Sequence, residues 1–198
     1  MESTEIILNK AEKLFADSGF GSVSMTNIAN ACKMSKANLY HHFSSKEDLY
    51  TQILIRAQKN TQNILEKTKV ITGTYIEKIE FFINEHLNQM LKDPMKYKLL
   101  AREFSDLGLT SRAMPSVGLM EKNLSQIVDL IDQAKKSKEI IETTDSKLLA
   151  YQLLSPNLTY ITHQNLFDSV FEGLGPSSNK HFSKTLTTNL LRGVRRND

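Results

Sequence analysis

The chain has 198 residues, a hydrophobic fraction of 40% and a formal net charge of +3 at pH 7. This length allows one or two domains with a substantial core, and so small a charge does not by itself identify a nucleic-acid-binding protein. The single cysteine excludes an internal disulfide framework. No apolar run approaches the roughly 20 residues of a membrane span and no signal peptide is visible, so we expect a cytoplasmic protein with no membrane partner. Few glycines and prolines, and no alternating strand-like runs, predict an all-α fold.

The first predicted helix covers residues 3–18. Four apolar residues recur there at the spacing of one helical face, which predicts a helix packed on a core. They are Ile7, Ala11, Leu14 and Phe15. Gly19 follows, at the position where helices commonly end in a residue of positive φ.

The segment from Ser24 to Lys46 predicts two short helices joined by a tight turn. Ser24 and Ser35 can each cap a helix, because a serine oxygen accepts from backbone N–H groups one turn on. Leu39 and Phe43 are spaced i, i+4 and are expected to point inward. The outer face of the second helix carries Lys36, Asn38, Tyr40 and His41, and residues 33–46 include no Asp or Glu. This pattern predicts a helix-turn-helix whose second helix enters the major groove of DNA.

The stretch IANACKMSKANLYHHFSSKEDL, residues 28–49, resembles the DNA-binding signature of TetR-like transcriptional regulators. The matching positions are Ile28, Ala29, Ser35, Leu39, Tyr40, His42, Phe43, Lys46, Glu47 and Leu49. Three positions depart from the family pattern: Cys32 replaces alanine, and Lys33 and Ala37 replace glycine. The site of Lys33 often needs a left-handed backbone, where a residue other than glycine costs roughly 1 kcal/mol. The match covers roughly the first quarter of the chain, and the remainder resembles the family only in length and helical character.

The residues after this motif predict a long helix followed by a domain boundary. Ser45 and Asp48 are expected to form a capping box at its start. The break at residues 71–74 is the best boundary in the chain. We therefore expect a DNA-binding domain over residues 1–49, a linking helix over 50–70 and a C-terminal domain over 74–198.

Five further helices are predicted in the C-terminal domain. They cover residues 75 to about 93, 94–107, 116–136, about 145–171 and about 179–194, with loops at 109–115 and 173–178. Pro94 suits the first position of its helix, and Thr144 or Asp145 can cap the fourth of the five. Pro156 lies inside that helix and should kink or break it.

Side-chain chemistry assigns roles on the predicted DNA face. Lysine can donate to guanine, asparagine can pair with adenine and alanine can touch a thymine methyl group, so Lys36, Asn38 and Ala37 are assigned to base edges. Ser24, Thr26, Tyr40, His41 and Lys46 are assigned to phosphates, and Ser35 lies beside them at the helix start. One helix-turn-helix makes few base contacts, so we expect a homodimer that reads a near-palindromic operator in double-stranded DNA.

The resemblance also implies a small-molecule effector site and a dimer interface in the C-terminal domain. Candidate ligand residues are Phe82, His86, Met90, Tyr97, Met114, Met120, Tyr151, Tyr160 and His163. Candidate interface residues are Leu158, Ile161, Phe167, Phe182, Leu186 and Leu190. Each has a simpler interpretation as core, since a methionine or aromatic residue at helical spacing is more often core than pocket. The resemblance alone implies that the effector relieves repression.

The sequence also bears on two other classes of protein, an enzyme and an interaction protein. The histidines show no metal-ligand spacing such as HExxH, and the chain has no phosphate-binding glycine loop, so neither an enzyme nor a bound metal or cofactor is predicted. A helical interaction protein that keeps the fold without binding DNA is the alternative. The presence of Tyr40 and Lys46 and the acid-free outer face argue against it.

Overall fold

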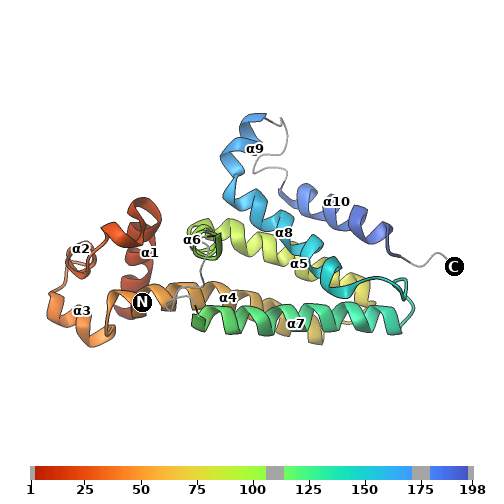
Figure 1. Ribbon diagram of the computed structural model, residues 1–198, viewed down its shortest axis with the longest axis horizontal. Helices are drawn as coiled ribbons and strands as arrows, with labels where there is room; N and C mark the ends of the chain where they lie inside the picture. Colours follow the sequence, from red (N-terminus) through yellow and green to blue (C-terminus); the bar gives the residue numbers. More distant parts are fainter. Residues whose placement is uncertain (1–2, 106–113, 171–178, 196–198) are drawn as a thin grey trace. The chain divides into compact units, whose positions relative to one another are not determined.

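A computed structural model describes residues 3–105, 114–170 and 179–195. Within these ranges the chain forms ten α-helices and a single isolated β-bridge, between Ile140 and Arg195, which confirms the all-α prediction (Figure 1). The helices are α1 Ser3–Ser22, α2 Met25–Ala31, α3 Lys36–His42, α4 Lys46–Val70, α5 Tyr75–Lys92, α6 Pro94–Ser105, α7 Met114–Lys136, α8 Ser146–Thr162, α9 Gln164–Val170 and α10 Asn179–Arg192. None of the helices so described is long and apolar enough to cross a membrane.

The chain folds into two compact units. The first comprises Met1–Lys59 with Pro94–Leu119, and the second comprises Asn60–Asp93 with Met120–Asp198. Helix α6 packs against α1 in the first unit, although the sequence analysis placed residues 94–107 in the C-terminal domain. The break at residues 71–74 falls in the short segment between α4 and α5. The proposed domain limits of 1–49 and 74–198 stay a prediction.

Aromatic rings hold the start of the first unit together. The ring centroid of Tyr50 on α4 lies 5.1 Å from that of Phe15 and 4.9 Å from that of Phe20. The main chain turns at Gly19, whose φ of 77° is one that glycine adopts without steric cost. The positive φ expected there is confirmed, but helical structure resumes after it and extends to Ser22, so Gly19 marks a kink rather than the helix end.

The second unit has a continuous apolar core. Side chains from α5, α7, α8 and α10 contribute fully buried residues, including Ile83, Ile131, Leu153 and Leu191. Figure 1 shows α10 running alongside α5 and α8, and these helices are in contact. The carboxylate of Glu139 accepts hydrogen bonds from the first backbone N–H groups of α5, at 3.1 and 2.9 Å. The segment after α7 thereby satisfies donors that a helix start leaves unpaired.

Helix α8 corrects the prediction made for Pro156. The helix continues through this proline to Thr162, and the change of direction into α9 comes at His163. A proline inside a helix removes one backbone donor, and the surrounding packing of buried Leu153, Asn157 and Tyr160 keeps the helix intact. Asp145 is confirmed as the cap of α8, with its carboxylate accepting from Lys147 N and Leu148 N. Residues 109–113 and 173–178, predicted as loops, and the predicted helical residues 106, 107 and 171 lie outside the described residues.

Candidate nucleic-acid interface

Two serine caps begin the helices that form the candidate interface. Ser24 Oγ accepts from Asn27 N at 3.1 Å, and Asn27 Oδ1 accepts from Ser24 N at 2.9 Å, which completes a capping box at the start of α2. Ser35 Oγ accepts from Asn38 N at 3.1 Å at the start of α3. Both predicted caps are confirmed. Because each cap uses a side chain of the helix-turn-helix itself, the starts of these short helices are defined locally by the sequence.

The turn between α2 and α3 follows a common way of ending a helix. Lys33 has a φ of 54°, which confirms the left-handed backbone expected there. Its N–H donates to Asn30 O, and the N–H of Met34 donates to Ala29 O, both at 3.0 Å. This pair of bonds is the Schellman motif, which satisfies carbonyl groups at the helix end. Under the turn, Ile28 and Leu39 are 0% exposed, so α2 and α3 are fixed to one core.

The outer face of the motif presents polar groups to solvent. Thr26, Lys36, Ala37, Asn38 and His41 are exposed, and Tyr40 is 46% exposed. Lys36 Nζ lies 5.9 Å from the ring centroid of Tyr40, within the range of a cation–π contact. No Asp or Glu occurs from residue 18 to residue 46. This surface offers hydrogen-bond donors and positive charge, the chemistry that DNA base edges and phosphates accept.

Lys46 and Asp48 make contacts that the sequence did not predict. Lys46 Nζ donates to Phe20 O at 2.9 Å and lies 4.2 Å from the Phe20 ring centroid, so this half-buried ammonium ties α4 to the end of α1. Its assignment to a phosphate stays a prediction. Ser45 Oγ accepts from Asp48 N as expected, but the Asp48 carboxylate accepts from the N–H and hydroxyl of Ser44 instead of from Ser45.

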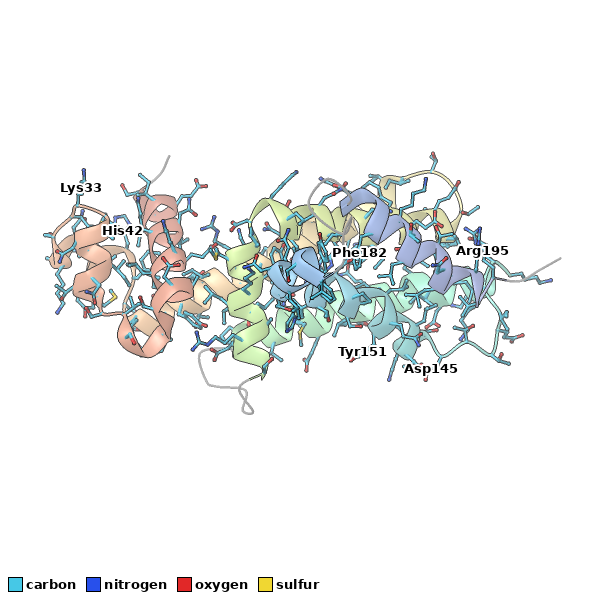
Figure 2. The ribbon with its side chains drawn as sticks, turned by 90° about the horizontal axis from the view of Figure 1, so that it is seen from above. Lys33, His42, Asp145, Tyr151, Phe182 and Arg195 are labelled. Atoms are coloured by element: carbon cyan, nitrogen blue, oxygen red, sulfur yellow. The ribbon has the colours of Figure 1, made fainter. Side chains whose placement is uncertain are left out.

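Two residues near the face were not assigned a DNA role from the sequence. Lys33 is exposed, and its side chain extends outward from the turn between α2 and α3 (Figure 2). His42 at the end of α3 lies with Nδ1 3.3 Å from Thr4 Oγ1 on α1. The signal for Lys33 was present in the sequence as a lysine at a position where the family pattern has glycine. The His42 contact joins residues 38 positions apart, and no local pattern could reveal it.

Burial shifts the pKa of one titratable side chain in each unit, Cys32 in the first and His86 in the second. Burial raises the pKa of the Cys32 thiol, and the nearby Lys10 acts in the opposite direction. Burial lowers the pKa of His86 in the second unit from 6.5 to about 4, so this imidazole is neutral at pH 7. Within the described residues, no group of three or more His, Cys, Asp or Glu side chains is arranged to hold a metal ion.

The candidate ligand residues do not form one group. Phe82 and His86 stack with ring centroids 5.6 Å apart, and both are buried, as are Met90 and Tyr160. Tyr97 is buried in the other unit. Met120 is half-buried, and His163 is exposed with Nδ1 close to Thr162 Oγ1; the side chain of Met114 lies outside those described. Tyr151 is 67% exposed, which does not fit a residue lining the interior of its unit.

Asn157 is a buried polar residue that the sequence analysis did not single out. It lies on α8 and is 0% exposed. Its Nδ2 donates to Ile83 O at 3.0 Å, while its Oδ1 is buried without a hydrogen-bond partner. A buried acceptor left unpaired costs stability, so the burial of this amide needs a reason beyond packing.

The candidate interface residues are unequally accessible. Leu158, Phe167, Phe182, Leu186 and Leu190 are half-buried, whereas Ile161 is 0% exposed and is covered by its own unit. The Phe182 ring stacks on Tyr160 with centroids 4.6 Å apart. Four large apolar residues on α8 and α9 that were not predicted for the interface are more exposed than any of these: Leu148 54%, Tyr151 67%, Leu166 56% and Val170 60%.

The N-terminal helices of the chain resemble known proteins in sequence. Residues 7–53 match the family model of bacterial regulatory proteins, tetR family. The chain is 45% identical over 53 residues to the HTH-type transcriptional regulator UidR of Escherichia coli K12, and this match covers 27% of each chain. The alignment thus spans about a quarter of that relative's length.

Solved structures match over nearly the whole chain. The ketosteroid transcriptional regulator KstR2 of Mycobacterium tuberculosis aligns with a TM-score of 0.79 at 15% identity, covering 99% of this chain and 96% of that one. AibR in complex with isovaleryl coenzyme A and operator DNA aligns with a TM-score of 0.76 at 21% identity, covering 96% and 98%. At these identities the likeness establishes the fold.

Proposed function

We propose, from the premise that the N-terminal DNA-binding domain of this chain belongs to the tetR family, that the protein is a sequence-specific regulator of transcription. It binds a near-palindromic operator in double-stranded DNA as a homodimer. A small-molecule effector in the C-terminal domain lowers its affinity for the operator and relieves repression. An effector can change DNA affinity only by as much as its own affinity differs between the two states of the protein.

The observation that carries the proposal is the division of α3 into a buried face and a polar face. Leu39 is 0% exposed and anchors the helix, while Lys36, Ala37 and Asn38 at its start are exposed. In helix-turn-helix proteins the first residues of the second helix contact base edges. Lysine and asparagine are side chains that read guanine and adenine in the major groove. A purely structural helix would have no need for this acid-free donor surface.

The effector and dimer parts of the proposal rest on different observations. A protein of similar fold, AibR, has been solved with an acyl coenzyme A and operator DNA together. The buried Asn157 and His86 supply polar groups inside the second unit that an effector could contact. The exposed apolar residues of α8 and α9, Leu148, Tyr151, Leu166 and Val170, are side chains that a second copy could cover.

The test begins with selection of bound sequences from a pool of random DNA duplexes by the purified full-length chain at moderate salt. Recovery of a near-palindrome is the expected result, with half-sites about one helical turn, roughly 34–36 Å, apart. Recovery of no motif, together with weak salt-sensitive binding only, would contradict sequence-specific recognition and favour an interaction protein that has lost the DNA role.

Substitutions in α3 then test the base assignment. Lys36→Ala and Asn38→Ala should each cost about 1–3 kcal/mol of operator binding and relax the preference at particular base pairs. Electrophoretic mobility shifts with single-base operator variants measure both effects. Lys136→Ala, an exposed lysine in the last turn of α7 in the other unit, removes the same charge and should leave operator preference unchanged. If Lys36→Ala changes neither affinity nor preference, the base assignment is wrong.

A further inference from the structure

Two lysines adopt a backbone conformation that usually belongs to glycine. Lys33 has a φ of 54° and Lys138 a φ of 60°, and no other non-glycine residue of the described chain has a positive φ. Each comes two residues after the last residue of a helix, α2 and α7 respectively. The N–H of Lys138 donates to Lys135 O and that of Glu139 to Ala134 O, which repeats the bonds made by Lys33 and Met34. The two lysines therefore occupy equivalent positions of the same helix-ending motif.

Helix termination does not explain a lysine at residue 33. Glycine adopts a positive φ without the steric clash that a side chain suffers there. The hydrogen bonds of this turn are made by backbone groups, so glycine would form them equally well. Within the described chain the Lys33 ammonium makes no hydrogen bond or ion pair, and the side chain is exposed. Within the described chain, nothing accounts for a lysine at this position.

The position of the turn indicates a reason for the lysine. Lys33 lies three residues before Lys36, so their Cα atoms are no more than about 11 Å apart. The start of α3 is the part of a helix-turn-helix that enters the major groove, and the preceding helix crosses the phosphate backbone. No carboxylate occurs between residues 18 and 46 to neutralise the ammonium. Lys138, by contrast, is followed by Glu139 and Glu142 and belongs to the other unit.

We propose that Lys33 binds a phosphate of the operator beside the groove that α3 occupies, and that its charge is kept at the expense of backbone strain in the turn. This inference rests on the proposed DNA-binding function. A phosphate contact fixes position and affinity without reading sequence. Lys33 is therefore expected to strengthen binding to every duplex, and the base preference is set by α3.

Lys33→Gly is the direct test, with the selected operator and a random-sequence duplex of equal length as probes. Each neutralised phosphate contributes about −0.9 to the slope of log affinity against log salt, so a dimer that loses two contacts should have a slope shallower by about 1.8. At 0.1 M salt this corresponds to a roughly 60-fold weaker affinity, and at 1 M salt the variant and the wild type should bind alike. Both probes should be affected equally.

Matched variants separate the effect of the Lys33 charge on DNA binding from the effect of its backbone conformation on stability. Lys138→Gly relieves the same conformation in the other unit, so both glycine variants should raise Tm by a few degrees while only Lys33→Gly weakens DNA binding. Asparagine tolerates a left-handed backbone and carries no charge, so Lys33→Asn should have the same salt slope as Lys33→Gly. Lys33→Arg keeps the charge and should retain the wild-type slope. An unchanged affinity for Lys33→Gly, or a loss of equal size at every salt concentration, overturns the proposal. A wild-type chain that binds neither probe would instead refute the DNA-binding function itself.

Discussion

Helices α3 and α5 differ in whether their candidate functional residues are also core residues. In α3 the core residue and a candidate DNA contact are neighbours in sequence, with Leu39 0% exposed and Tyr40 46% exposed. In α5 the candidate ligand residues Phe82, His86 and Met90 are 1%, 7% and 3% exposed, and so belong to the core as well. A surface site leaves its functional residues out of the packing, where a sequence pattern can reveal them. An interior site uses the same residues for both purposes, and hydrophobic periodicity cannot separate them.

The sharpest test of this difference compares adjacent positions of α3. Leu39→Ala should cost about 3 kcal/mol of unfolding free energy, because it removes a fully buried side chain and leaves a cavity. Tyr40→Ala should cost less than about 1 kcal/mol, since the ring is half exposed, and should weaken binding to all DNA sequences alike. Denaturant unfolding followed by circular dichroism, paired with mobility shifts, measures both quantities.

The opposite outcome would show that the two faces of α3 are not independent. If Tyr40→Ala lowers unfolding free energy as much as Leu39→Ala, the ring is part of the packing and its effect on DNA binding is indirect. Leu39→Met serves as the control, because a swap of similar volume should cost less than about 1.5 kcal/mol.

Local chemistry made much of the fold predictable. Ser24 and Ser35 were predicted as caps, and Thr144 or Asp145 as a third, because such side chains satisfy donors within one turn of the chain; the structure confirms Ser24 and Ser35 and selects Asp145. The positive φ at Gly19 followed from its position after a helical segment, and that at Lys33 from the glycine of the family pattern at this site. Pro156 shows where such reasoning stops, since its local effect is to break a helix, whereas packing in the second unit keeps α8 continuous.

Contacts between distant segments were not predictable from one sequence. The hydrogen bond from Lys46 to Phe20 O joins residues 26 positions apart, and no pattern in either segment indicates it. The packing of α6 on α1 also joins segments that are far apart in the sequence, and no local pattern indicates it. The candidate DNA face could be specified because it lies within one motif of short span. The candidate ligand residues are drawn from α5, α6, α7, α8 and the α8–α9 junction, and the packing of such segments is a tertiary property.

The burial of His86 predicts an acid-sensitive second unit. Its pKa of about 4 in the folded chain lies below the ordinary value of 6.5, so between these values the unfolded chain binds a proton that the folded chain does not. Stability should therefore fall as the pH drops through this window, by about 2 kcal/mol between pH 7 and pH 5 from this residue. Denaturant unfolding of wild type and His86→Gln across this range measures the difference.

His86→Gln should flatten the dependence of unfolding free energy on pH between pH 7 and pH 5. A constant difference between wild type and His86→Gln from pH 7 to pH 5 would mean that the folded chain accommodates the imidazolium, and the burial argument would be wrong.

The smallest expected change in unfolding free energy comes from removing a helix cap, and one cap from each unit can be compared. Ser24 caps α2 with a bond of 3.1 Å from Asn27 N, and Asp145 caps α8 with bonds of 2.9 and 3.0 Å. Replacement of either by alanine should cost about 1 kcal/mol of unfolding free energy. Only Ser24→Ala should also weaken operator binding, because α2 braces the reading helix. Thermal unfolding and mobility shifts on the same preparations measure the two effects.

Ser24→Asp makes this last comparison more decisive. Aspartate caps a helix about as well as serine, so the variant should keep the wild-type Tm. It also places a carboxylate on a surface that has no acid from residue 18 to residue 46, and a negative charge there should repel the phosphates of every duplex. Unchanged stability with lost DNA binding would show that the acid-free face is a functional requirement. Retained binding would mean that Ser24 lies away from the DNA and that its hydroxyl serves the helix alone.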